Sequence, residues 1–119
     1  MHDPIGLVTG GPGDYDSYGN NDPRNLGREL ELQDLLGFIK ARNIRNVNVL
    51  TSDVHHAAFV NYSPSRATGG FTAYDPFDEF VIGAIHSGAF GPNSLDSSFG
   101  PQYGYGTYIN YQSRSTLRS

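Results

Sequence analysis

The sequence has no cysteine among its 119 residues, and it has no long apolar run. Without cysteine, the chain can form neither a disulfide framework nor a thiolate metal site. Its apolar runs are all far shorter than the roughly 20 residues that a transmembrane helix needs. The first residues, 1–6, lack the cationic and apolar segments of a signal peptide. These absences argue against a disulfide-stabilised domain and a membrane span.

Positive charge is also scarce. The formal net charge is -4 and the isoelectric point is near 5.3. Lys and Arg number 8 and form no cluster, so the electrostatic attraction that drives nucleic-acid binding is missing. The sequence therefore has no nucleic-acid-binding signature.

Glycine and proline are abundant, with 15 and 7 residues, and long stretches of Gly, Asn, Asp, Ser and Tyr separate a few apolar runs. The length suits one domain and is too short for two. Apolar residues distributed so unevenly are more typical of a part of a larger domain than of a self-sufficient one.

The strongest periodic pattern predicts a helix over Leu26–Arg42. Four apolar residues share one helical face at i, i+3, i+4 and i+7, namely Leu32, Leu35, Leu36 and Ile39. Acidic residues lie in the first turns and basic residues in the last, which suits the helix dipole. Asn43 is the expected end of the helix, and the apolar face of the helix is expected to pack on the strand Val47–Leu50.

Four short apolar segments are expected to form strands. The segment Val47–Leu50 follows the helix closely and predicts a buried strand. Ala57–Val60 indicates a strand or the start of a short helix, and the remaining two predicted strands are Ile5–Thr9 and Phe80–Ile85. Helix followed by strand over a tight connection predicts an α/β fold.

The rest of the chain is expected to be irregular. Residues 10–25, 63–74 and 87–106 are rich in turn-forming residues. The segment Tyr103–Ser119 contains few aliphatic residues and is predicted to be a poorly ordered tail.

Asp53 and His55 come directly after the predicted strand Val47–Leu50, and in α/β sheets ligand sites form beyond the carboxyl ends of strands. A carboxylate and an imidazole two residues apart can converge on one metal ion, and this pair suits iron, zinc, manganese or calcium. The spacing by itself is weak, and the alternative is an Asp that caps a turn beside a surface His.

Two further histidines are weaker candidates. Successive side chains of an extended segment point in opposite directions, so His56 is expected to flank the site rather than share it with His55. His86 follows the predicted strand Phe80–Ile85, where it either closes the strand with a hydrogen bond or contacts substrate. No phosphate-binding loop and no nucleophile elbow is present.

Several motifs in one order resemble the C-terminal part of PhoD-like alkaline phosphatases. The segment Leu50–His55, which reads LTSDVH, is the most telling of them. The others are residues 4–7, 25–32, 34–40, 44–47, 74–81, 88–93 and 95–101. The resemblance covers about residues 4–101, so residues 1–101 are read as the C-terminal portion of such a domain and residues 102–119 as an unrecognised tail.

The resemblance implies a metallophosphoesterase fold, with two β-sheets flanked by helices, and hydrolysis of phosphate monoesters and diesters. It implies iron and calcium as cofactors, a phosphate ester as substrate, and a secreted or periplasmic location. It also implies that Asp53 and His55 are metal ligands, and His86 is a candidate substrate contact. The family's other ligands come from motifs upstream of this chain, and His56 stands where the family usually has Tyr.

Three hypotheses follow for the function. The first is a phosphatase fragment, inactive alone and lacking the N-terminal half of its domain. The second is a non-catalytic remnant, and the third is a metal-binding module without hydrolysis. Missing upstream ligands and the unrecognised tail are the features that separate them.

Overall fold

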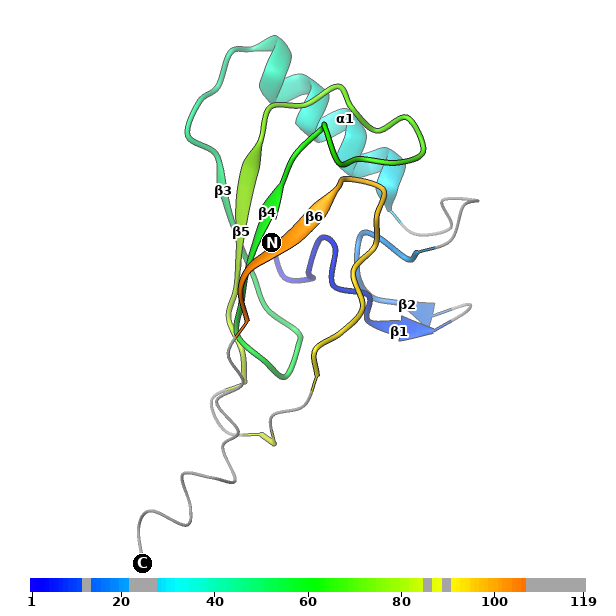
Figure 1. The fold of residues 1–119 in the computed structure, drawn as a ribbon, viewed down its shortest axis with the longest axis vertical. Helices are drawn as coiled ribbons and strands as arrows, with labels where there is room; N and C mark the ends of the chain where they lie inside the picture. Colours follow the sequence, from blue (N-terminus) through cyan, green and yellow to red (C-terminus); the bar gives the residue numbers. More distant parts are fainter. Residues whose placement is uncertain (12–13, 22–27, 85–86, 89–90, 107–119) are drawn as a thin grey trace, which may run out of the picture.

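The computed structural model describes residues 1–11, 14–21, 28–84, 87–88 and 91–106. Its elements follow one another as β1 (Gly10–Gly11), β2 (Asp14–Tyr15), α1 (Glu29–Ala41), β3 (Asn48–Thr51), β4 (Ala58–Tyr62), β5 (Phe77–Val81) and β6 (Pro101–Gly106). Figure 1 shows α1 near one end of the sheet strands and the β1–β2 pair farther along the same side. The described part is a compact α/β fold, as predicted.

The main sheet has four strands in the order β3-β5-β4-β6. The β3 strand runs parallel to β5, whereas β4 is antiparallel to both β5 and β6, so the sheet is mixed. Because β3 lies at the edge, only one of its sides is paired with another strand of this sheet. A separate two-stranded sheet of β1 and β2 lies within residues 10–25, so the prediction of an irregular segment is wrong at these two strands.

Helix α1 confirms the predicted helix, although residues 22–27 lie outside the described part and the expected start at Leu26 is among them. The predicted end is confirmed, because Asn43 adopts a left-handed φ of 55° and the Ile44 amide donates to Ile39 O at 3.1 Å. Asn tolerates this conformation better than most residues.

The predicted apolar face of α1 is wrong at one position. Leu32 and Leu36 are buried, but Leu35 is 45% exposed. At about 100° per residue, Leu35 lies about 60° from Leu32 on the side away from Leu36. The buried stripe instead includes Glu29, whose Oε1 accepts a hydrogen bond from the Asn20 amide at 3.0 Å.

Apolar side chains of α1, the N-terminal segment and one face of the sheet form a single core. From the N-terminal segment come Ile5 and Leu7, and the strands present alternate residues to the same side, as in Phe77 and Val81 of β5. Stacked aromatic rings join β4 to β5, with 4.5 Å between the centroids of Tyr62 and Phe77.

The predicted strands are present as β3 and β4, and the others are shifted. The expected burial of β3 is wrong, because it is an edge strand in which Leu50 is 59% exposed. Of the predicted strand Ile5–Thr9, only Leu7 forms a bridge, to Leu95. The predicted strand Phe80–Ile85 begins earlier in the structure, at Phe77, and ends at Val81, and residue 85 lies outside the described part. The polar residues Asp78 and Glu79 concealed that start, because they interrupt the apolar run.

Residues 101–106 form β6 beside β4, so the prediction of an irregular segment is wrong there. A small-residue and tyrosine pattern, PQYGYG, gave no strand signal. The segment becomes a strand by pairing with β4. Gly104 allows this close pairing, because a Cβ at this position would lie 2.4 Å from the Phe59 ring. Residues 107–119 lie outside the described part.

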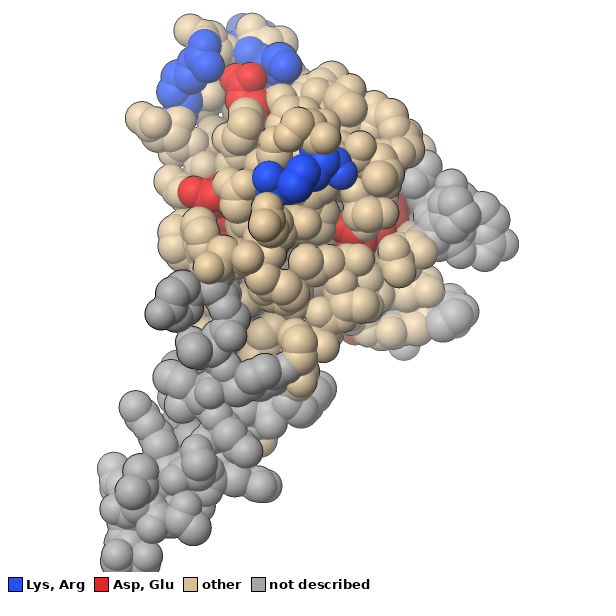
Figure 2. Space-filling view, in the orientation of Figure 1, with Lys and Arg blue, Asp and Glu red and all other residues tan. Residues whose placement is uncertain are grey.

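The surface carries few charges. Figure 2 shows isolated basic and acidic groups on a largely uncharged face, with several basic side chains at its upper end. Within the described ranges, no helix is long and apolar enough to cross a bilayer.

Candidate metal site at the carboxyl end of β3

The turn after β3 presents Asp53 to solvent. The backbone of Asp53 has a φ of 67°, a left-handed conformation that Asp adopts more readily than bulky residues. Its neighbours Thr51 and Val54 are buried, with 1% and 5% of their surfaces exposed. The fold therefore fixes the turn on both sides while its carboxylate faces outward.

His55 is held by a segment that follows β5. Its Nδ1 lies 2.7 Å from Gly88 O and 3.4 Å from Ser87 Oγ. Asp53 and His55 also line one open hollow of about 360 Å³, together with Ser52, Val54 and residues 82–84. The predicted convergence of Asp53 and His55 on one ion stays a prediction.

His56 is 5% exposed and its imidazole lies against Gly91. A Cβ at Gly91 would stand 2.7 Å from His56 Nδ1, so the glycine makes room for the ring. His86, the candidate substrate contact, lies outside the described residues.

A group that the sequence did not reveal lies around Asp53. Ligand atoms of His2, Asp3 and Asp53 all lie within 4.8 Å of one another. Three such side chains could together hold a metal ion, and among the described residues no other group of histidine and acidic side chains is placed to do so. Fifty residues separate its two halves, and a His-Asp pair at the start of a chain is too common to indicate a site.

Backbone contacts bring the N-terminal segment to β3. The Ser52 amide and hydroxyl both donate to His2 O, at 2.9 and 3.0 Å, and the Met1 nitrogen donates to Leu50 O at 2.9 Å. Three hydrogen bonds thus continue the exposed edge of β3 with residues 1–2. They set His2 and Asp3 beside the Asp53 turn.

Arg28 at the start of α1 fixes Asp3. Its guanidinium donates to Asp3 Oδ2 at 2.6 Å and to Asp16 O, and lies 4.2 Å from the centroid of the Tyr18 ring. Hydrogen bonds from His2 and Arg28 lower the pKa of the Asp3 carboxyl. The hydrogen bond with Asp3 and the negative charges of Asp3 and Asp53 raise the pKa of His2.

A buried carboxylate anchors the same N-terminal segment deeper in the fold. Glu79 of β5 is 0% exposed, and its Oε1 accepts from the Ile5 amide at 2.8 Å and from Thr51 Oγ1 at 2.6 Å. Tyr62 OH donates to Oε2 at 2.5 Å. Desolvation, then the charge of Glu79 and the hydrogen bond to it, raise the pKa of Tyr62 well above its ordinary value. Glu79 thus joins three elements just beneath the turn.

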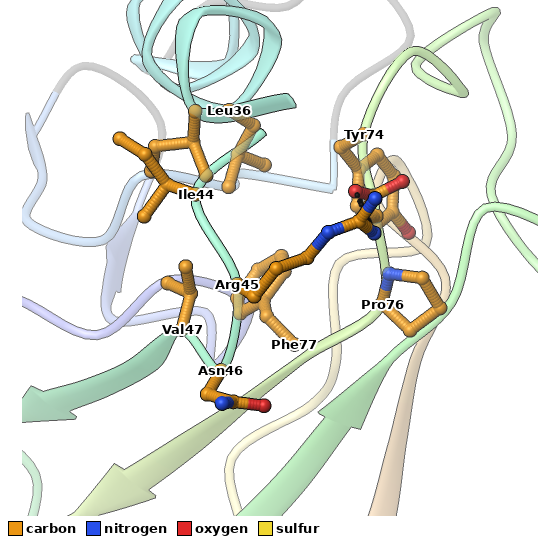
Figure 3. Close-up of a pocket in the computed structure, with 10 residues that line it drawn as sticks. Leu36, Ile44, Arg45, Asn46, Val47, Tyr74, Pro76 and Phe77 are labelled. Carbon is orange, nitrogen blue, oxygen red and sulfur yellow. Dashed lines mark hydrogen bonds and ion pairs between the residues drawn. The ribbon is translucent and has the colours of Figure 1, made fainter. Parts of the chain in front are cut away.

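The second hollow, of about 250 Å³, lies between α1 and the start of β5. Figure 3 shows Arg45 among the residues that line it, with Val47 and Phe77. Arg45 forms an ion pair with Asp75 at 3.4 Å. Lys40 also approaches Asp75, at 3.7 Å. The two charged residues that line this hollow, Arg45 and Asp75, are paired with each other.

One imidazole and two carboxylates form a donor set that suits iron, manganese and zinc. Of the two metals that the motif resemblance implies, this group therefore fits iron, whereas calcium prefers six to eight oxygen ligands. Three protein donors leave further coordination positions to water or substrate, as in catalytic rather than structural sites.

Comparison with known protein families gives one match. The model of the family described as PhoD-like phosphatase matches residues 4–116. This span includes Asp53, His55 and the whole of the main sheet. Comparisons with curated proteins and with solved structures gave no significant match.

Proposed function

Since the chain belongs to the PhoD-like phosphatase family, we propose that it provides part of a metal-dependent phosphatase site that hydrolyses phosphate monoesters or diesters. The observation that carries the proposal is the Asp53 turn: within the matched segment, the DVH motif follows β3 and presents a carboxylate to solvent. Ligand sites of α/β sheets form at such strand ends.

In this proposal Asp53 and His55 act through metal, with iron and calcium as the implied ions. When bound, the metal supplies Lewis-acid polarisation of the phosphoryl group and activates water. Asp53 provides a carboxylate oxygen on a turn that its buried neighbours keep rigid. His55 borders the same hollow, and its contact with Gly88 O fixes the ring. The hollow is open enough to admit a phosphate ester.

We further propose that the chain supplies the C-terminal part of a metallophosphoesterase fold and lacks appreciable turnover by itself. A binuclear site needs enough ligands to hold two cations near each other, and the described residues offer one group of three donors. Catalysis depends on fixed geometry, because small misplacements of reacting groups cost large factors in rate. The substrate is a phosphate ester, and a secreted or periplasmic location follows from the family alone.

Phosphate retention and turnover test these statements separately. The purified chain is dialysed against inorganic phosphate with and without Fe³⁺ and Ca²⁺, and assayed with p-nitrophenyl phosphate. We expect metal-dependent phosphate binding that Asp53→Asn abolishes, with no appreciable turnover. Phosphate binding that needs neither metal nor Asp53 would overturn the site. Robust turnover that Asp53→Asn abolishes would support the phosphatase and overturn the fragment statement.

A metal-binding module without hydrolysis is the alternative function that the group around Asp53 also supports. The two functions differ in whether the metal-loaded chain retains phosphate. Metal binding with no retention of phosphate would select the module.

A further inference from the structure

We infer that the structure assigns His2 and Asp3, together with Asp53, to one binding site for a divalent transition cation such as Zn²⁺ or Mn²⁺. The inference rests on the proposed function for the role of Asp53 and adds to it two ligands from the N-terminal segment. Neither the DVH motif nor its spacing pointed to them.

The spacing of the donor atoms supports a single ion. His2 Nδ1 and Asp3 Oδ1 are 2.8 Å apart, and adjacent ligands on an octahedral ion with bonds of about 2.1 Å stand about 3 Å apart. An ion held by both atoms would lie to one side of the line between them, so its binding would displace the hydrogen bond that now joins them. A carboxylate oxygen of Asp53, on the turn after β3, lies within 4.8 Å of the ligand atoms of His2 and Asp3.

The fold holds these donors together without the ion. The two hydrogen bonds from Ser52 fix the carbonyl of His2, and the Ile5 amide is tied to Glu79. Arg28 orients Asp3 through Oδ2, which leaves Oδ1 on the side of His2. Such outer contacts orient metal ligands and limit the side-chain entropy lost on binding.

The charges also favour a cation at this place. The three side chains bring two carboxylates, and Arg28 neutralises one of them. In the part of the chain that the structure describes, Asp53 forms no ion pair with Lys or Arg. His2 is exposed and Asp3 half-buried, so an ion reaches the site from solvent without any opening of the fold.

The donor types select the class of ion. An imidazole nitrogen with two carboxylate oxygens suits zinc and manganese, whereas calcium prefers six to eight oxygen ligands. Asp53 is the member of the group that also lines the open hollow, so an anionic ligand in the hollow would approach the ion from the side of Asp53. The site therefore lies where the proposed phosphatase chemistry needs a metal.

Zn²⁺ titration calorimetry on the tag-free chain tests the assignment, with Mn²⁺ electron paramagnetic resonance as a second probe. We expect one site, and at least about a tenfold loss of affinity in His2→Ala and in Asp3→Asn, since even changes to outer-shell groups cost 10- to 100-fold. Asp34→Asn, an exposed carboxylate on α1, serves as the matched control and should keep wild-type affinity. Circular dichroism confirms that each variant is folded.

The outcomes divide cleanly. Loss of affinity in both His2→Ala and Asp3→Asn supports the site, and wild-type affinity in either variant overturns it, as does the absence of Zn²⁺ binding at millimolar metal. His55→Ala reports on the proposed phosphatase site instead. A loss confined to His55→Ala and Asp53→Asn would keep the DVH turn as a metal site and remove His2 and Asp3 from it.

Discussion

Two carboxylate clusters join the N-terminal segment to the sheet, and they differ in what surrounds them. Around Glu79, every partner is a buried neutral donor, and both carboxylate oxygens are occupied. Around Asp53, the partners are His2 and Asp3, which face solvent or are half-buried. The contrast teaches that a carboxylate saturated by donors inside the core stabilises the fold, whereas carboxylates gathered at the surface remain open to a ligand.

The largest expected effect is on the buried cluster. Glu79→Ala removes the acceptor of three donors and leaves the Ile5 amide and two hydroxyls buried without it. We expect the free energy of unfolding to fall by about 3–5 kcal/mol. Urea denaturation followed by circular dichroism measures it.

Asp78→Ala is the matched control for that loss. Asp78 precedes Glu79 in β5, is half-buried, and accepts one hydrogen bond, from Asn61 Nδ2 at 2.8 Å. We expect it to cost about 1 kcal/mol. Equal losses in the two variants would mean that the three donors to Glu79 contribute little.

An intermediate effect should appear at alkaline pH. Burial raises the pKa of Tyr74 to about 12, above the ordinary 10, so the fold favours the neutral phenol that donates to Phe99 O at 2.6 Å. This stabilisation is full below pH 10 and is lost as the pH rises toward 12. A shift of two units corresponds to about 2–3 kcal/mol at most.

Urea midpoints between pH 9 and 12 measure that loss. In Tyr74→Phe, the free energy of unfolding should fall less steeply with pH, because this residue no longer ionises. The variant should also be less stable at pH 9, because the hydrogen bond to Phe99 is gone. If the free energy of unfolding of Tyr74→Phe falls with pH as steeply as that of wild type, the loss of stability at alkaline pH comes from other groups, such as Tyr62.

The smallest expected effect is at the exposed cluster, and it depends on metal. Without metal, Asp53→Asn should change the free energy of unfolding by no more than about 0.5 kcal/mol, since the side chain is exposed. With Zn²⁺ at ten times its dissociation constant, wild type should gain about 1.4 kcal/mol and Asp53→Asn much less. Thermal unfolding with and without Zn²⁺ provides the measurement. If Asp53→Asn lowers the free energy of unfolding by several kcal/mol without metal, the exposed cluster stabilises the fold as the buried one does, and the two clusters do not differ in this respect.

The sequence predicted those elements whose signals are local. Apolar residues at helical spacing gave α1, and Asn43 gave its end, because a left-handed residue there depends only on neighbouring backbone. The β-branched run after the helix gave β3, and the motif order gave the family. Strand β6 escaped prediction because Gly and Tyr form a strand there only through pairing with β4.

The sequence by itself determined the α/β class, the main helix, the DVH turn and its placement at a strand end. The tertiary structure decided which side chains surround that turn. No local pattern reports that residues 1–2 continue the edge of β3, that Glu79 holds the Ile5 amide, or that Leu35 faces solvent. These contacts join residues far apart in the chain, and they form because the edge of β3 and the buried carboxylate each require partners that local sequence does not supply.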